Sequence, residues 1–294
     1  MNRPLQGKVA VVAGGTRGAG RGIAAMLGEA GATVYVTGRS VRGNLSEMGR
    51  TETIEETAEL VTSLGGDGRA VRVDHTVEQE VQALFERVKE EQSGQLDILV
   101  NDIWGGDPFS DWDSRFWEHS LQNGLKMQNI AVHTHMITSY YAAPLMIKRN
   151  RGLILEITDG FDYRYRGNLY YSLAKISTIH LAAAMAEELR EYQVTSIALS
   201  PGYLRSEAML DHFGVTEDNW RDAGLKDPHF LMSETPAYIG RAVAALASDP
   251  YVHRKTGKVL TTWELSDEYN FVDIDGRRPH WGRYAEEQGF YKDR

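Results

Sequence analysis

The chain has 294 residues, of which 42% are hydrophobic and 25% are charged, proportions typical of a globular protein with a sizeable core. Its formal net charge of −9 argues against a broad nucleic-acid-binding surface, because binding to a phosphate backbone relies on an excess of Lys and Arg. The chain has no cysteine, which excludes disulfides and thiolate chemistry, and no apolar run long enough to span a bilayer.

Strands and helices are predicted to alternate along the chain. Apolar or β-branched runs predict strands at Lys8–Ala13, Thr33–Thr37, Arg69–Val73, Leu96–Val100, Leu153–Thr158, Val194–Leu199 and Lys258–Leu260. Helical patterns lie between them at Gly18–Ala30, Thr51–Leu64, Val77–Glu91, Ile130–Arg149, Leu169–Glu191 and Thr235–Ala247. This order is typical of right-handed crossovers, and it predicts a single-domain α/β fold with a three-layered, Rossmann-like doubly wound parallel sheet.

Two stretches, Gly105–Trp117 and Tyr203–Met232, and the tail Glu264–Arg294 fall outside this alternation. Long ordered loops at the carboxyl ends of parallel strands are where substrate sites lie in open α/β folds. Surface excursions and subunit contacts are the alternatives. Seven aromatic residues are predicted to open on this end of the sheet, which favours a bulky or ring-bearing substrate: Trp104, Trp112, Trp117, Tyr163, Tyr165, Tyr170 and Tyr203.

The stretch Val9–Ile23, VAVVAGGTRGAGRGI, predicts a buried strand, a glycine turn and the start of a helix. Unpaired backbone N–H groups and the positive end of the helix dipole suit a pyrophosphate at this point. Gly14, Gly18 and Gly20 would allow the backbone to approach the phosphates closely. The alternative is a tight turn that binds no ligand.

The end of the second predicted strand indicates which dinucleotide fits. An acidic residue at this place accepts a hydrogen bond from a free ribose 2′-hydroxyl, whereas Arg compensates a 2′-phosphate. Here the strand ends at Arg39, and Arg17 in the glycine turn can reach the same side. We therefore expect NADP(H) as the cofactor, the alternative being that both arginines are solvated surface charges.

Tyr171 and Lys175 are four residues apart on a predicted helix, so their side chains share one face. An ammonium near a phenol favours the phenolate, and a tyrosine so tuned can exchange a proton with a carbonyl or alcohol oxygen. A Tyr and a Lys on an ordinary amphipathic helix are the alternative.

These motifs occur together in a familiar order. AGGTRGAG, VTGR, VDHT, DILVN, YSLAK and SPGYLRS resemble the short-chain dehydrogenase/reductase family in sequence and approximate spacing, from about Gly7 to Leu260. The stretches NDIWGG and WELSDEYNFVDIDGRRP resemble the branch that includes dehydrogenase/reductase member 1 and its bacterial relatives.

The resemblance implies that Tyr171 is the general acid/base and that Lys175 holds the nicotinamide ribose and lowers the tyrosine pKa. It places Asp74 at the adenine, Asn101 by the ribose, and residues 201–206 at the nicotinamide carboxamide. The implied cofactor-binding residues are Gly14, Thr16, Arg17, Gly18, Ala19, Gly20, Arg39, Asp74, Asn101, Lys175, Pro201, Gly202, Leu204 and Ser206.

The sequence departs from the family pattern at three places. Asp102 stands where the family has a second Asn, and Ala131 stands where the family has the helix asparagine of its catalytic tetrad. Thr158 and Asp159 align with the paired serines that orient the substrate carbonyl. An Asp159 carboxyl donates to a carbonyl only when it is protonated, and when ionised it opposes a phenolate and favours a cationic substrate. A helix-capping role is the alternative.

We therefore predict an NADP(H)-dependent oxidoreductase that interconverts a carbonyl and an alcohol by hydride transfer, with reduction as the expected direction. Its catalytic residues would be Tyr171, Lys175, Asp159 and Thr158. The alternatives are a catalytically weak dinucleotide-binding protein with a sensor-like role, and dehydration or isomerisation by the same Tyr and Lys.

The predicted NADP-binding catalytic domain spans residues 1–263, with a substrate loop at 203–233, and residues 264–294 form its C-terminal extension. We expect a homodimer or homotetramer that acts on a small-molecule substrate. We expect no metal, because the nine histidines lack ligand spacing, and no nucleic-acid or membrane partner. A cytoplasmic location is expected because Met1–Lys8 is too short and polar for a secretory signal.

Overall fold

The first strand, β1 (Val9–Ala13), lies inside the sheet between two other strands and is buried along its whole length. Ala10 and Val12 pack into a hydrophobic cluster on one face of the sheet, and Val9 and Val11 pack into a second cluster on the other face. A strand covered on both faces needs apolar residues at every position, which explains the run VAVVA.

The computed structural model describes residues 3–45 and 49–290 and contains a seven-stranded parallel sheet. The strand order is β3-β2-β1-β4-β5-β6-β7, which confirms the predicted doubly wound, Rossmann-like fold. The other strands are β2 (Thr33–Gly38), β3 (Asp67–Arg72), β4 (Ile98–Asn101), β5 (Gly152–Ile157), β6 (Val194–Ser200) and β7 (Val259–Thr261).

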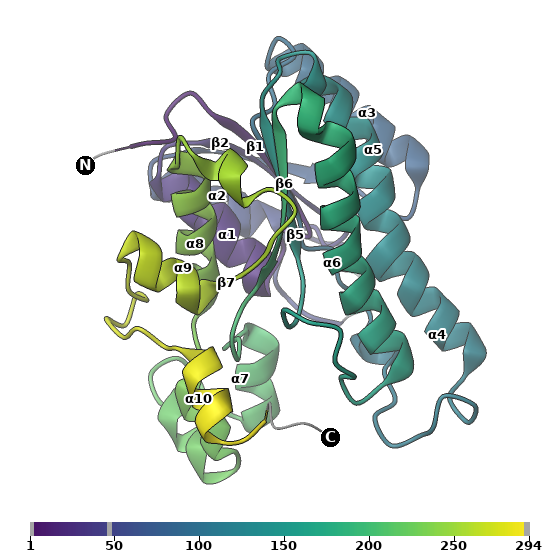
Figure 1. Cartoon of the computed structure of the whole chain (residues 1–294), viewed down its shortest axis with the longest axis vertical. Coiled ribbons are helices and arrows are strands. Elements are labelled where there is room, and N and C mark those ends of the chain that lie inside the picture. The colour runs from purple at the N-terminus through teal and green to yellow at the C-terminus, as the bar shows by residue number, and fades with distance from the viewer. Residues whose placement is uncertain (1–2, 46–48, 291–294) are drawn as a thin grey trace.

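Helices cover both faces of the sheet (Figure 1). One layer contains α1 (Gly18–Glu29), α2 (Ile54–Ser63) and α8 (Pro236–Ser248). The opposite layer contains α3 (Glu78–Glu91), α5 (Thr134–Ile147) and α6 (Leu169–Leu189). Among the described residues, no helix combines the length and apolarity that a membrane crossing needs.

The helix predicted to begin at Ile130 begins earlier. α4 (Leu121–Gln128) continues through a π-helical turn, Asn129–His133, into α5. The Ser120 hydroxyl caps α4 by accepting a hydrogen bond from the Asn123 N–H at 3.3 Å. The predicted start is too late because α4 is short and polar. Two of its three leucine and methionine side chains are exposed.

Three further short helices lie in segments that the pattern left without structure: α7 (Glu207–Phe213), α9 (Thr262–Tyr269) and α10 (Trp281–Glu287). Single turns of 3₁₀ helix occupy Asp107–Phe109, Arg190–Tyr192, Trp220–Leu225, Pro228–Met232 and Val252–Lys255. The segment 203–233, predicted as a loop, therefore folds around its own small cluster, Phe213, Trp220, Ala223 and Phe230.

Candidate active site

A cavity of about 1040 Å³ lies at the carboxyl ends of the strands. It brings together most of the residues singled out from the sequence, which the open end of a parallel sheet explains. These are Gly14, Thr16, Arg17, Gly18, Ala19, Arg39, Asp74, Thr158, Asp159, Tyr171, Lys175, Pro201, Gly202, Leu204 and Ser206. Gly20 and Asn101 do not line it.

The glycine turn is shaped to hold an anionic oxygen. Gly14 has a φ of +89°, and a Cβ at this position would overlap the carbonyl of Asp102 on the neighbouring strand end. The N–H of Gly18, at the start of α1, donates to the carboxylate of Glu207 across 2.8 Å. A side-chain carboxylate thus occupies an N–H group at the start of α1, so the turn can hold an anionic oxygen.

Arg17 in the turn, and Arg39 and Arg50 beyond it, line the cavity. Arg17 Nη2 donates to the Ser40 hydroxyl at 3.3 Å, and Arg17 Nε is buried without a hydrogen-bond partner among the described residues. Arg39 Nη1 lies 4.0 Å from Asp74 Oδ2. Arg50, which the sequence analysis missed, also lines the cavity; its only signal was a basic residue just before a predicted helix.

Arg50 is held by carboxylates on both sides. Its Nη2 lies 2.7 Å from Glu52 Oε1 and 2.8 Å from Asp211 Oδ2, and Glu52 also lies 3.9 Å from Arg17 Nε. Burial lowers the pKa of Arg17, so its positive charge costs free energy there. An anion bound between the arginines would offset that cost.

Asn101, which the resemblance placed by the ribose, does not line the cavity. It is fully buried, and its Nδ2 donates to Ser139 Oγ at 2.9 Å and to Glu156 Oε1 at 2.7 Å. Glu156 lies on β5 and needs these donors because a buried carboxylate without partners is costly. The amide of Asn101 is therefore committed to the protein interior.

The same carboxylate pairs with a histidine that the sequence analysis did not select. His135 Nδ1 lies 2.6 Å from Glu156 Oε2, and His135 Nε2 lies 3.1 Å from the carbonyl of Ile103. Both ring nitrogens thus face oxygen atoms, and the ring connects Glu156 to the backbone just before Trp104. In the sequence, only the single acidic residue Glu156 inside the apolar run LILEI could have indicated a buried polar pair here.

Asp159, and not Thr158, contacts the tyrosine. The Tyr171 hydroxyl donates to Asp159 Oδ2 across 2.8 Å. The Thr158 hydroxyl donates to the backbone carbonyl of Lys175 at 2.8 Å and is buried. Of the two residues aligned with the family serines, Thr158 supports α6 from beneath, and Asp159 faces the reacting centre.

The environment of Tyr171 opposes the phenolate. Burial, followed by the charge of Asp159 and its hydrogen bond, raises the pKa of Tyr171 well above its usual value. The expected lowering by Lys175 is thus outweighed. The Lys175 ammonium lies 4.2 Å from the centre of the Trp104 ring and 5.5 Å from that of Tyr171, and burial lowers its pKa.

Asp102, the unexplained departure in the fourth motif, lies between the start of α1 and Lys175. A Cβ on Gly20 would meet its carboxylate, and its backbone N–H donates to the Ala13 carbonyl at 2.8 Å. Burial raises the pKa of Asp102 to about 7, although the positive charge of Lys175 opposes this rise. The carboxyl therefore titrates near neutral pH.

Aromatic rings surround the tyrosine. Trp104 and Trp112 pack edge-on against Tyr171, with ring centres 5.4 and 5.1 Å away. Of the seven aromatic residues expected at the pocket, Trp104, Trp112, Tyr165 and Tyr203 line the cavity, and Trp117, Tyr163 and Tyr170 do not. Four others line it: Phe161 from the same loop as Tyr165, and Trp263, Trp281 and Phe290 from the C-terminal part of the chain.

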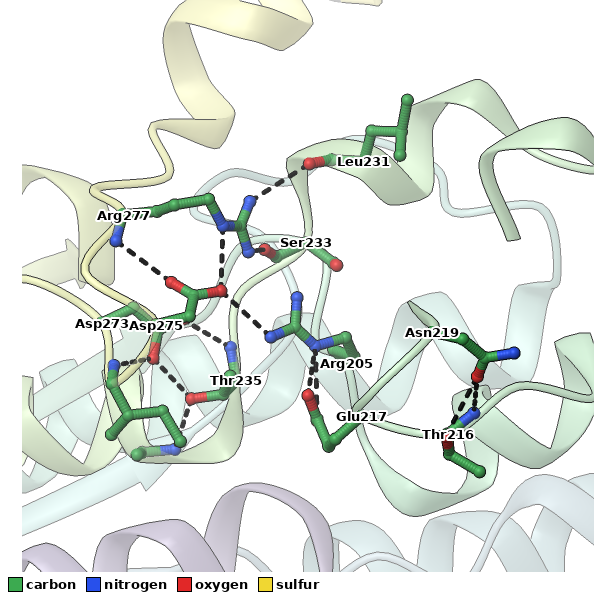
Figure 2. Close-up of polar contacts among 12 residues, drawn as sticks. Arg205, Thr216, Glu217, Asn219, Leu231, Ser233, Thr235, Asp273, Asp275 and Arg277 are labelled. Atoms are coloured by element: carbon green, nitrogen blue, oxygen red, sulfur yellow. Dashed lines mark hydrogen bonds and ion pairs between the residues drawn. The ribbon is translucent and has the colours of Figure 1, made fainter. Parts of the chain in front are cut away.

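The C-terminal segment is tied to the segment 203–233 by a group of charged side chains (Figure 2). Asp275 lies 3.2 Å from Arg205 Nη2 and 2.9 Å from Arg277 Nε. Arg277 Nη2 also donates to the Ser233 carbonyl at 2.8 Å, and Arg205 Nε lies 3.0 Å from Glu217. These contacts place α10, and with it Trp281, against the cavity.

Known proteins share this sequence over most of its length. The short chain dehydrogenase family profile matches residues 8–213. Dehydrogenase/reductase SDR family member 1 of Homo sapiens is 37% identical over 281 residues, which cover 94% of this chain and 86% of the relative. The 7alpha-hydroxysteroid dehydrogenase of Escherichia coli K12 is 29% identical over 209 residues, covering 71% of this chain and 75% of the relative.

Solved structures show the same fold. A short chain dehydrogenase from Mycobacterium thermoresistibile has a TM-score of 0.77 at 23% identity, covering 95% of this chain and 92% of its own. A 7alpha-hydroxysteroid dehydrogenase complexed with NADH and 7-oxo glycochenodeoxycholic acid has a TM-score of 0.71 at 26% identity, covering 94% and 97%. The chain therefore belongs to the short-chain dehydrogenase/reductase family of oxidoreductases, which use a nicotinamide dinucleotide.

Proposed function

We propose that the protein is an NADPH-dependent reductase that converts the carbonyl of a bulky or aromatic substrate to an alcohol. The observation that carries the proposal is the Tyr171 hydroxyl, which lines the cavity among aromatic rings with Asp159 and Lys175 beside it. The Escherichia coli relative is by name a hydroxysteroid dehydrogenase, which agrees with a bulky substrate.

The bound dinucleotide supplies the hydride. The N–H groups at the start of α1 would hold its pyrophosphate, with Gly18 exchanging the Glu207 carboxylate for a phosphate oxygen. Lys175 would hold the nicotinamide ribose, as the resemblance implies. Arg17, Arg39 and Arg50 line the same cavity and would bind a 2′-phosphate through charge-assisted hydrogen bonds, which favours NADP(H) over NAD(H).

Tyr171 would donate the proton. As negative charge develops on the carbonyl oxygen, that oxygen becomes a stronger acceptor than Asp159 and draws the hydroxyl toward it. The Lys175 ammonium stabilises the phenolate that is left. Asp159 would orient the hydroxyl before the transfer. Because the pKa of Tyr171 is raised, the residue stays protonated at neutral pH, which suits reduction and hinders the reverse reaction.

The test is NADPH consumption against a panel of ketones, aldehydes, quinones and imines, with Tyr171→Phe as the control. Tyr171-dependent reduction of a carbonyl supports the proposal. Tight NADPH binding without such turnover would instead favour the catalytically weak binding protein, which the Asp at position 159 and the Ala at position 131 support. Product formed without net NADPH oxidation would indicate dehydration or isomerisation.

We also propose that the chain forms a homodimer or homotetramer. Leu121 and Leu125 on α4 and Met136 and Tyr140 on α5 are exposed at four-residue spacing, an apolar stripe along one continuous helix. Two copies of such a stripe are self-complementary in a two-fold arrangement. Light scattering should give a mass above 32.9 kDa, and Leu125→Glu should reduce it to the monomer. A monomeric wild type would refute the proposal.

A further inference from the structure

Arg166 is a cavity-lining residue whose hydrogen-bonding capacity is largely unused. Its Nη2 lies 3.4 Å from Asp162 Oδ1, a long bond, and its Nε is buried without a hydrogen-bond partner among the described residues. Only 18% of the side chain is exposed. A guanidinium carries five donors, and donors that are removed from water without acceptors are costly.

The backbone places this guanidinium beside the reacting centre. The N–H of Arg166 donates to Ser172 Oγ at 2.7 Å, and Ser172 follows Tyr171 on α6. The guanidinium lies over Gly160, the residue after Asp159, and a Cβ on Gly160 would overlap its nitrogen atoms. Gly160 also has a φ of +83°, so the position needs glycine both for the turn and for the space.

The wall around Arg166 is otherwise aromatic. Phe161 and Tyr165 line the cavity from the same loop, and the Trp112 ring packs against Tyr171 at 5.1 Å between ring centres. Asp162 also forms an ion pair with Arg164, whose Nε lies 3.0 Å from Asp162 Oδ2. The charge of this carboxylate is therefore divided between two arginines. The cavity thus combines an apolar wall with an incompletely paired cation.

We propose that Arg166 binds a carboxylate of the substrate, so that the substrate is an oxo acid with a bulky apolar body. A planar carboxylate accepts two parallel hydrogen bonds from a guanidinium, and it would supply acceptors to a side chain whose printed protein partner is Asp162. This inference rests on the proposed function for the carbonyl group of the substrate, but the binding of the carboxylate does not require turnover.

The probes are 4-benzoylbutyrate and its methyl ester, which differ in the negative charge and in one methyl group. Binding is measured by quenching of tryptophan fluorescence and turnover by NADPH consumption. We expect the wild-type protein to bind the acid about tenfold more tightly than the ester, and Arg166→Met to lose that preference with little change for the ester. Arg166→Gln is made in parallel as a second variant that removes the positive charge. An NADPH affinity equal to that of the wild type shows that a variant has kept its fold.

Arg164→Met is the matched control, because Arg164 lies in the same loop but its side chain is 49% exposed. It should keep the preference for the acid. Equal affinity of the wild type for acid and ester, or an equal loss in the Arg164 variant, would overturn the proposal. Arg166-dependent binding of the acid without any turnover would refute the reductase function alone, whereas Tyr171-dependent turnover without Arg166-dependent binding would refute the carboxylate site alone.

Discussion

The two ends of the cavity are built in different ways. The cofactor end comes mainly from one continuous unit, β1, α1 and β2, in which each turn follows directly from a strand. The substrate end is assembled from the loops after β4 and β5, the segment 203–213, and the residues Trp263, Trp281 and Phe290. The structure of the proposed cofactor end thus depends on local sequence, whereas that of the proposed substrate end depends on contacts between distant segments.

This difference bears on the departure from the family at Asp159. A change in the glycine turn meets backbone atoms immediately, as the absent Cβ of Gly14 shows. At the substrate end, Asp159 replaces the expected serine and still finds a partner in Tyr171, because a cavity between segments has room for a different side chain. We therefore expect substitutions to be tolerated less at the proposed cofactor end, and substrate specificity to be set at the other end.

The substitution Tyr171→Phe should distinguish the two ends of the cavity most clearly, because it should affect turnover and not cofactor binding. Removal of the hydroxyl should lower kcat about 10³-fold, the usual contribution of a positioned acid, while the Kd for NADPH changes less than about twofold. Steady-state kinetics and a fluorescence titration measure the two quantities. A comparable loss in both would mean that the tyrosine belongs to cofactor binding.

Arg39→Asp tests the cofactor end alone. It should weaken NADPH binding about 10²-fold through lost charge-assisted contacts and like-charge repulsion, with NADH affected far less. Titration of both dinucleotides decides the matter, and Arg72→Asp, an exposed arginine at the end of β3, is the control. Equal weakening of both cofactors would contradict a 2′-phosphate site.

Arg205→Met should damage the substrate end alone. Arg205 is buried, stacks on Trp220 at 4.0 Å from the ring centre, and pairs with Glu217 and Asp275. Its loss should cost about 2 kcal/mol of unfolding free energy, because both acidic partners are partly exposed. Denaturant unfolding and the KM for substrate should change, whereas an altered Kd for NADPH would show that the two ends are coupled.

Asp159→Asn should shift the pH dependence. The Asp159 charge and hydrogen bond raise the pKa of Tyr171, so neutralising the side chain lowers that pKa. Alcohol oxidation requires the phenolate, and its rate should therefore rise at lower pH in the variant than in the wild type. Profiles of kcat/KM for the oxidation from pH 6 to 10 measure the shift. Superimposable profiles would mean that Asp159 does not control the tyrosine.

The smallest effect is expected for Glu207→Gln. The Glu207 carboxylate occupies the N–H of Gly18, so it must be displaced before a phosphate oxygen binds there. A neutral amide competes less well and repels the phosphate less, and NADPH should bind about threefold more tightly. A calorimetric titration measures the gain. Weaker binding would indicate that Glu207 supports the cofactor site.

Sequence predicted the parts of the site that depend on neighbours along the chain. Gly14 and Gly18 of the glycine turn, Arg39 and the Tyr171–Lys175 pair line the cavity, since helix period and strand ends determine their placement. The position of the Asn101 amide could not be predicted, because it depends on Glu156 and Ser139, which approach only after the sheet and α5 have packed.

The remaining aromatic lining was beyond sequence patterns for the same reason. Trp281 and Phe290 reach the cavity because α10 folds back onto the segment 203–233, a contact between residues far apart in the chain. Asp159 was selected correctly as a departure, but only the folded chain distinguishes its orientation from that of Thr158.

The pairing of Asp275 with both Arg205 and Arg277 has a consequence for how such proteins can be recombined. In a chimera that imports residues 203–233 from a relative without an arginine at position 205, Asp275 would keep only Arg277 of these two partners. The two segments, which are 70 residues apart at Arg205 and Asp275, form one unit of exchange. We expect a chimera to acquire the substrate specificity of a relative only when the segment 203–233 and the C-terminal segment are exchanged together.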